Sequence, residues 1–287
     1  MSINGCDCYL VIKTGERETV VPYSEETIRE NIVLLREEAA IEGVGEEGAL
    51  RKSNGTTGCV VTPLTMSTAP LLLCLAMGYA ERLEYVSETR DLYCSMLQLL
   101  PFEDSDFFDI VQDRGTERKL CERCRVESFE LRIHRNEALK LKLDISGAYP
   151  PAPYPYGDSF HHISEERFNG DCVTYTINGA SYTTLYGCLI TVKKRGGTKT
   201  DVWLYRSLEQ AQDIPPLIDE LTITARLQRD KYERRHYGMF QLTLTRLLLV
   251  SDETRIDAAD TVVGPLRYYA AGTVKAEVFT NDTGSLP

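Results

Sequence analysis

The sequence has no apolar stretch long enough to cross a bilayer. Its longest apolar run, residues 69–77, is far below the roughly 20 residues that a membrane span needs. The first residues also lack the basic start and long apolar core of a secretory signal. We therefore expect a chain that folds in a cytoplasm and has no membrane partner.

Basic charge is also scarce. The 287 residues contain 32 lysines and arginines against 43 aspartates and glutamates, which gives a formal net charge of −11. A protein that grips nucleic acid does so mainly by neutralising phosphates with basic side chains. The charge balance therefore argues against nucleic-acid binding as the main function.

Motifs for catalysis are missing as well. The sequence contains no Gly-x-Ser-x-Gly, Walker or His-Glu-x-x-His pattern. His161-His162, with the glutamates that follow, is more typical of a solvated loop than of a metal cluster. Gly196-Gly197 is followed by no helix, which indicates a turn and not a phosphate cradle. We expect no catalytic residue, no metal site and no cofactor.

Nine cysteines are present, an odd number that favours free thiols over a disulfide framework. Cys6, Cys8, Cys121 and Cys124 could together supply four thiolates to zinc. The alternative function is therefore a cytoplasmic zinc- or thiol-dependent β-barrel enzyme or binding protein. Against it, residues three apart on a regular strand point to opposite faces.

Strand patterns dominate the chain. Two short strands are expected around Thr14-Gly15. Asn178-Gly179 suits a type I′ turn and predicts a hairpin that pairs Ile177 with Ala180, Tyr175 with Tyr182 and Val173 with Thr184. Near Arg246 the alternation breaks, which indicates a bulge or a strand end buried on both faces.

In the hairpin from Cys124 to Gly147, the loop must contain an odd number of residues if the apolar side chains of both strands are to share a face. Residues opposite each other in an antiparallel pair lie on the same face. A three-residue loop, 135–137, keeps the apolar residues together and pairs Glu130 with Lys142. The same register places Arg132 opposite Lys140, and like charges repel. We therefore expect a longer loop, or a carboxylate from another strand or chain.

Two helices are predicted, near 24–40 and 68–77. The first follows Ser24 and carries an apolar stripe at Ile28, Ile32, Leu35 and Ala39; the second has Pro70 in its first turn and Gly78 at its end. An acidic loop is expected from Glu37 to Gly55.

The predicted fold is mainly β: an antiparallel β-sandwich or partly closed barrel with one or two flanking helices. We expect a β-rich module over 1–148, a proline-rich connection over 149–170 that is neither sheet nor helix, and a second β-rich module over 171–287. One continuous domain is the alternative.

The order of several segments resembles the tail tube proteins of long-tailed bacteriophages. These are Gly58-Cys-Val-Val-Thr-Pro63, the helix ending Leu75-Ala-Met-Gly78, Pro101-Phe-Glu-Asp-Ser with Phe107-Phe-Asp-Ile-Val111, Cys124-Arg-Val-Glu-Ser-Phe129 and residues 139–147. Phe168-Asn-Gly170, Asn178-Gly179, residues 221–228 with 240–249, and 272–279 continue the resemblance.

This resemblance implies a non-enzymatic virion protein, assembled in the host bacterial cytoplasm, whose rings stack into the tail tube. Rings of six chains, or of three double-module chains, would enclose a lumen that DNA passes without specific binding. The implied partners are further copies of the chain, the tape-measure protein, and the tail terminator and distal tail proteins. The net charge independently suits a lumen that repels phosphates.

Assembly contacts are expected from charged residues of the acidic loop, of the hairpin from Cys124 to Gly147, which we call the central hairpin, and of the 193–200 turn. Tyr268-Tyr269 and Tyr154-Pro-Tyr156 are further interface candidates, because tyrosine is enriched at interfaces. The charged candidates are Glu42, Glu46, Glu47, Glu130, Arg132, Lys140, Lys142, Lys193, Arg195 and Lys199.

Overall fold

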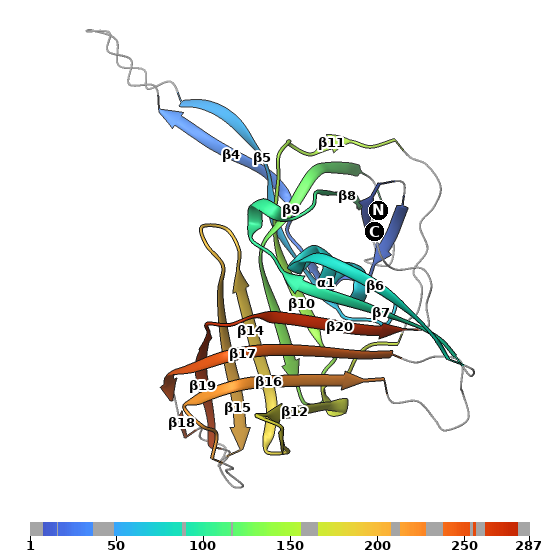
Figure 1. Ribbon diagram of the computed structural model, residues 1–287. Helices are drawn as coiled ribbons and strands as arrows, with labels where there is room; N and C mark the ends of the chain where they lie inside the picture. The colour runs from blue at the N-terminus through green and yellow to red at the C-terminus, as the bar shows by residue number, and fades with distance from the viewer. Residues whose placement is uncertain are drawn as a thin grey trace. The chain divides into compact units, whose positions relative to one another are not determined.

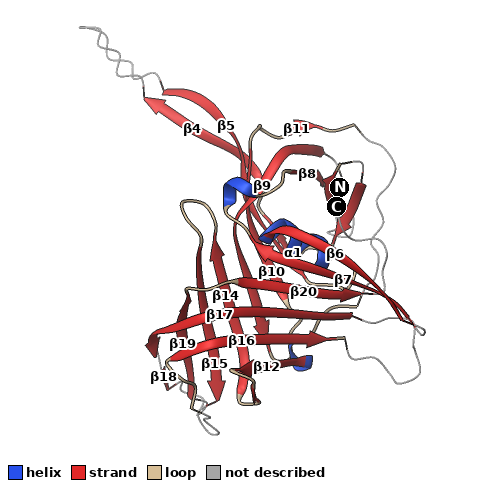
Figure 2. Cartoon of the chain, in the orientation of Figure 1, coloured by secondary structure: helices blue, strands red, loops and turns tan. Residues whose placement is uncertain are grey.

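A computed structural model describes residues 8–15, 17–36, 49–87, 90–115, 117–155, 166–207, 213–227, 238–252, 255–256 and 262–280 (Figure 1). Antiparallel strands make up most of the described chain (Figure 2). Within these residues the sheet does not close into a barrel. The predicted β class is therefore confirmed, and the predicted partial barrel closure is not seen.

The chain divides into two compact units that interleave along the sequence. Unit 1 contains residues 1–60, 107–125 and 144–162, and unit 2 contains 61–106, 126–143 and 163–287. The predicted modules on either side of residues 149–170 stay a prediction.

Unit 1 is built around β1, which pairs with β2 across the Gly15 turn and with β8 on its other edge. Strand β8 continues the sheet to β9. The strands that lie wholly in unit 1 are β1 (Tyr9–Thr14), β2 (Arg17–Val21), β3 (Glu25–Glu26), β4 (Arg29–Arg36), β8 (Phe108–Asp113) and β11 (Ala152–Pro153). Three strands contribute residues to both units: β5 (Ala49–Pro63), β9 (Arg118–His134) and β10 (Lys140–Gly147).

Unit 2 contains the remaining strands and the only α-helix of the described residues. They are α1 (Ala69–Met77), β6 (Gly78–Ser87), β7 (Arg90–Leu99), β12 (Val173–Ile177), β13 (Ala180–Tyr182), β14 (Leu185–Lys193), β15 (Lys199–Ser207), β16 (Leu217–Arg226), β17 (Gly238–Asp252), β18 (Arg255–Ile256), β19 (Val262–Ala270) and β20 (Val274–Thr280), with 3-10 turns η2 (Phe102–Asp104) and η3 (Gly170–Cys172).

Helix α1 confirms the helix predicted at 68–77. Every residue of it is buried, and it packs against β6, β7 and β20. Pro70 lies in its first turn, and Gly78 ends it in the left-handed conformation with φ 100°. No helix within the described ranges is long and apolar enough to span a membrane.

Strand β17 joins two sets of strands in unit 2. Along one edge it pairs with β16; along the other, residues 238–244 pair with β20 and residues 247–252 pair with β19. Arg246, with φ 56°, lies at the change of partner. In Figure 1, β14 and β15 run across the direction of β16, β17 and β20. A strand that changes sheets at an irregular residue is how orthogonally packed sheets make a corner.

The corner requires a close approach of two backbones. Ala271 donates its N–H to the Arg246 oxygen at 2.9 Å, and Gly272 donates to the Thr245 oxygen at 3.1 Å. A Cβ on Gly272 would lie 2.4 Å from that Thr245 oxygen. Only glycine fits at position 272, because any other side chain would clash with the Thr245 backbone.

The Asn178-Gly179 hairpin is confirmed in its turn and its register. Both residues have positive φ, 50° and 81°, and Ile177 pairs with Ala180 and Tyr175 with Tyr182. The predicted Val173–Thr184 pair is not formed, because β13 ends at Tyr182.

The helix predicted near 24–40 is wrong over the residues that the structure describes. Glu25–Glu26 and Arg29–Arg36 are strands, and β4 pairs with β5 from Arg29↔Thr57 to Arg36↔Ala49. The apolar spacing fits a helix equally well, but pairing with a 15-residue strand prevails over local propensity.

Two loop predictions also need correction. Residues 49–55 of the expected acidic loop belong to β5, while 37–48 lie outside the described residues. The proline-rich connection includes the short strand β11, in which Ala152 and Pro153 pair with Leu120 and Lys119. Proline is compatible with such an edge position.

We predict that Gly272→Ala lowers the free energy of unfolding by more than about 2 kcal/mol, since a backbone oxygen occupies the Cβ position. Gly179→Ala is the matched control: it has open space around it and meets only the cost of positive φ, about 1 kcal/mol. Urea unfolding of both variants tests this, and equal losses would contradict the close approach.

Candidate functional site

The central hairpin neutralises its own charges. Arg132 forms an ion pair with Glu130, and the Lys140 ammonium lies 3.3 Å from the Glu137 carboxylate. The connection between β9 and β10 spans residues 135–139, with Asn136 at φ 66°. The loop is therefore longer than three residues, as one alternative expected, and carboxylates of the same hairpin neutralise Arg132 and Lys140. Lys142, on β10, is half-buried.

The outer side of unit 2 carries four rows of residues across β9, β14, β15 and β19, which we call the charged face. Directly paired residues share a side of the sheet, so the register defines the rows. Residues between the rows, such as Leu131, Ile190 and Leu204, are buried. The rows are Ser128–Lys193–Lys199, Glu130–Thr191–Asp201–Tyr269, Arg132–Leu189–Trp203–Arg267 and His134–Gly187–Tyr205–Pro265.

The only tryptophan of the sequence lies at the middle of the charged face. The Arg267 guanidinium is 5.3 Å from the Trp203 ring centroid and 3.0 Å from the Asp201 carboxylate. Beside it, the rings of His134 and Tyr205 lie 5.9 Å apart. Trp, Tyr and Arg are the side chains that dominate binding energy at protein interfaces. This composition indicates a surface for protein contact.

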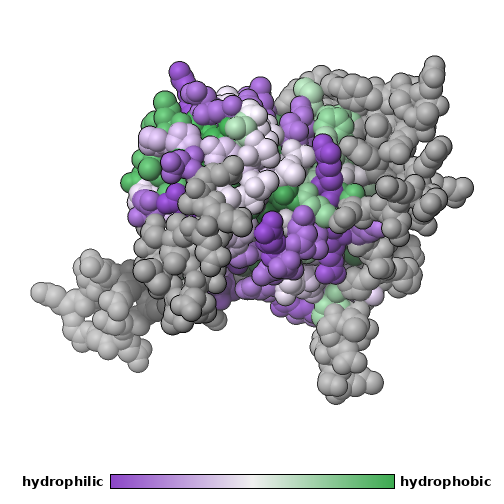
Figure 3. All heavy atoms as spheres, turned by 90° about the horizontal axis from the view of Figure 1, so that it is seen from below, coloured by the Kyte–Doolittle hydropathy of each residue, from purple (hydrophilic) through white to green (hydrophobic). Residues whose placement is uncertain are grey.

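An apolar row adjoins this face where β16, β17 and β19 meet. We define the apolar row as Leu217, Leu248, Val250 and Tyr269, whose exposed fractions are 50%, 47%, 55% and 38%. Leu248 pairs directly with Leu217 and with Tyr269, so these three side chains lie on one side of the sheet. Figure 3 shows hydrophobic surface on the side where β17 ends. The end of β17 is therefore exposed, so the alternative of burial on both faces is wrong. The positive φ of Arg246 and the register shift between Leu249 and Ser251 agree with the other alternative, a bulge.

The neighbouring tyrosines differ in role. Tyr268 is buried and donates its hydroxyl to the Pro215 oxygen at 2.9 Å, and burial raises the pKa of its phenol to about 12. Tyr269 is the exposed member of the pair. Tyr154 is half-buried and accepts a hydrogen bond from the Lys13 ammonium at 2.8 Å, whereas Tyr156 lies outside the described residues.

The 193–200 turn contains a residue that sequence reasoning missed. Lys193, Arg195 and Lys199 are exposed as expected, and Arg195 forms an ion pair with Glu127. Lys194 is buried at the end of α1, where its ammonium donates to the Ala76 oxygen at 3.1 Å and to the Ser105 hydroxyl. Two adjacent lysines gave no signal that one of them points inward.

The thiols of Cys121 and Cys124 are fully buried. A bulge places Glu122 and Arg123 opposite Asp109, with Arg123 at φ 51°, so the strand does not alternate regularly between the two cysteines. The prediction that they point to opposite faces is therefore wrong. Burial raises the pKa of the Cys121 thiol to about 11 and that of Cys124 further still. Protonated thiols in an apolar core are poor zinc ligands. Cys8 is half-buried, and Cys6 lies outside the described residues.

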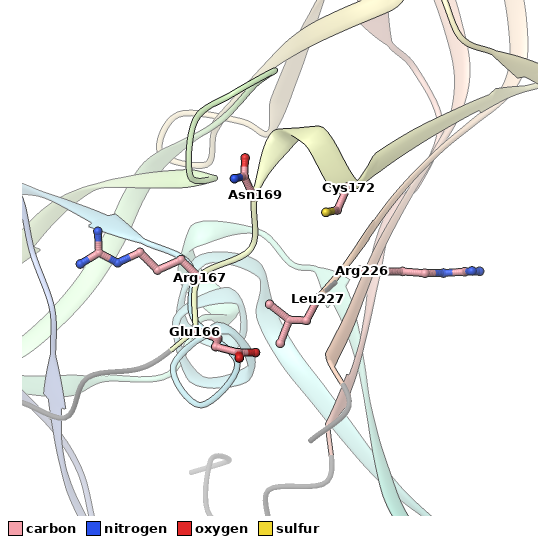
Figure 4. Close-up of a pocket in the computed structure, with 6 residues that line it drawn as sticks. All are labelled: Glu166, Arg167, Asn169, Cys172, Arg226 and Leu227. Atoms are coloured by element: carbon pink, nitrogen blue, oxygen red, sulfur yellow. The ribbon is translucent and has the colours of Figure 1, made fainter. Parts of the chain in front are cut away.

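A pocket of about 310 Å³ lies in unit 2 (Figure 4). In the close-up the Arg226 and Arg167 side chains point away from one another, and no pair of charged groups converges. The described lining residues therefore show no converged acid–base or metal-binding arrangement. Its described lining residues are Glu166, Arg167, Asn169, Cys172, Arg226 and Leu227.

No protein-family model and no curated protein matches the sequence. Of the charged candidates, Glu130, Arg132, Lys193 and Lys199 share the charged face. Arg195, Lys140 and Lys142 lie outside its four rows, and Glu42, Glu46 and Glu47 fall outside the described residues. The apolar row was missed because Leu217 and Leu248 are 31 positions apart, so only the strand register shows that they pair.

We predict that stability falls as the pH rises from about 9 to about 11. The unfolded thiol of Cys121 ionises near 8.5, but the folded thiol keeps its proton to about 11, so alkali favours the unfolded state. Urea unfolding across this range tests the effect, and Cys121→Ala should reduce the slope. Rapid modification of native Cys121 at neutral pH would contradict its burial and reopen the thiol alternative.

Proposed function

We propose that the chain is a structural subunit of a bacteriophage tail tube, assembled in the host cytoplasm into rings that stack around a DNA-conducting lumen. The observation that carries the proposal is the apolar row, because exposed contiguous apolar side chains mark sites of protein contact. In a head-to-tail ring, this row of one subunit packs against a different surface of the next.

The antiparallel β fold and the acidic composition support the same proposal. Tube subunits of the family that the sequence resembles are β-rich, and the described chain is mainly strand. A net charge of −11 disfavours adhesion of DNA to the lumen. The tape-measure protein and the proteins at the two tube ends remain the proposed partners, and no catalytic step is assigned.

The proposal predicts rings or tubes of the purified protein in negative-stain electron microscopy. Leu217→Asp with Leu248→Asp should abolish them, because two buried charges would be left in the subunit contact. Both sites are exposed in the isolated chain, but two aspartates directly opposite each other repel, so the free energy of unfolding should fall by about 1–2 kcal/mol and leave the chain folded.

Tyr149→Asp is the control, since Tyr149 is 49% exposed and is not a member of the apolar row. It should leave assembly intact. Persistent monomers of the wild-type chain at high concentration, with tape-measure protein supplied, would overturn the proposed function.

A further inference from the structure

The charged face of unit 2 is complementary to itself. Its second row carries the carboxylates of Glu130 and Asp201, and its third row carries the guanidinium groups of Arg132 and Arg267. The first row carries Lys193 and Lys199, and the fourth carries the rings of His134 and Tyr205. Reading across the rows, cations are followed by anions, then cations, then aromatic rings.

We infer that two copies of this chain pair face to face through the charged face, about a two-fold axis. The axis lies in the interface and runs across the strands, between the second and third rows. It exchanges the second row with the third, and the first row with the fourth. This contact goes beyond the proposed ring contact, which uses the apolar row; the two surfaces share only Tyr269.

The rotation brings opposite charges together. Glu130 faces the partner's Arg132 on the same strand. Asp201 is offset sideways from the partner's Arg267 by one strand spacing, about 4.8 Å, across the gap between the two sheets. Lys199 faces the partner's Tyr205, so an ammonium lies over an aromatic ring. Sheets pack about 10 Å apart, a gap that arginine and glutamate side chains can bridge.

The size of the face sets the strength of the pair. Four strands at about 4.8 Å and seven residues at about 3.4 Å give roughly 450 Å² on each copy, or about 900 Å² in total. Stable complexes bury about 1,200–2,000 Å², so the pair is weak and reversible. Because its centre is charged, the pair weakens as salt is added.

The test exchanges the charges of the two central rows in the full-length chain. One variant carries Glu130→Arg and Asp201→Arg, and the other carries Arg132→Glu and Arg267→Glu. Each variant alone places like charges opposite one another, so the dissociation constant measured by sedimentation velocity at low salt should rise by more than about tenfold. An equimolar mixture of the two should recover a dimer, as should the chain with all four exchanges.

The control is Arg226→Glu with Lys275→Glu, which makes the same charge change as Arg132→Glu with Arg267→Glu, at exposed positions on β16 and β20, strands outside the four rows. It should dimerise like the wild type. Circular dichroism and urea unfolding show that each variant is folded.

Two results would overturn the two-fold pairing. One is a wild-type chain with no two-chain species at low salt. The other is a dimer that each charge variant loses but that neither the mixture nor the fourfold exchange restores, because a head-to-tail contact gives that result. Rings and tubes are seen separately by electron microscopy, so this failure does not bear on the proposed function.

Discussion

The change of hydrogen-bonding partner along β17 is the constraint on which unit 2 depends. A single strand of 15 residues pairs with β16 along one edge, and with β20 and then β19 along the other. Two sets of strands are thereby held at a corner by backbone hydrogen bonds. The close approach of Gly272 to Thr245 sets the geometry of that corner, and the buried core lies on its inner side.

The same corner determines what the outer side of unit 2 presents. Beyond Arg246, three consecutive side chains of β17, Leu248, Leu249 and Val250, are not covered by any described residue and lie exposed beside Tyr269. The neighbouring strands instead expose balanced charge around one tryptophan. Two surfaces of different chemistry therefore adjoin on one sheet, and each suits a different kind of contact: an apolar one that favours permanent burial and a charged one that favours reversible pairing.

Local chemistry allowed parts of the fold to be predicted from the sequence. The Asn178-Gly179 turn requires positive φ, and helix α1 is bounded by Pro70 and Gly78, so both were found at their residues. The helix prediction for 24–40 failed because the apolar spacing of this segment fits a helix and a strand equally well. Its pairing partner, β5, begins a dozen residues later, so the segment alone does not show that it forms a strand. The prediction that Cys121 and Cys124 point to opposite faces failed because a bulge interrupts the regular alternation of side chains along β9, and the sequence carries no obvious signal of that bulge. For the candidate site, the charges were predictable residue by residue. Their arrangement in rows depends on long-range register, which no local pattern encodes.

Lys194 couples a surface turn to the interior. Its ammonium is buried and donates to the Ala76 oxygen near the end of α1, while its two neighbours in the sequence, Lys193 and Arg195, are exposed. The turn is therefore attached to a buried helix by this side chain, in addition to its backbone hydrogen bond from the Lys194 N–H to the Glu127 oxygen at 2.8 Å. Shortening the Lys194 side chain would therefore disturb the C-terminal end of a buried helix as well as the turn itself.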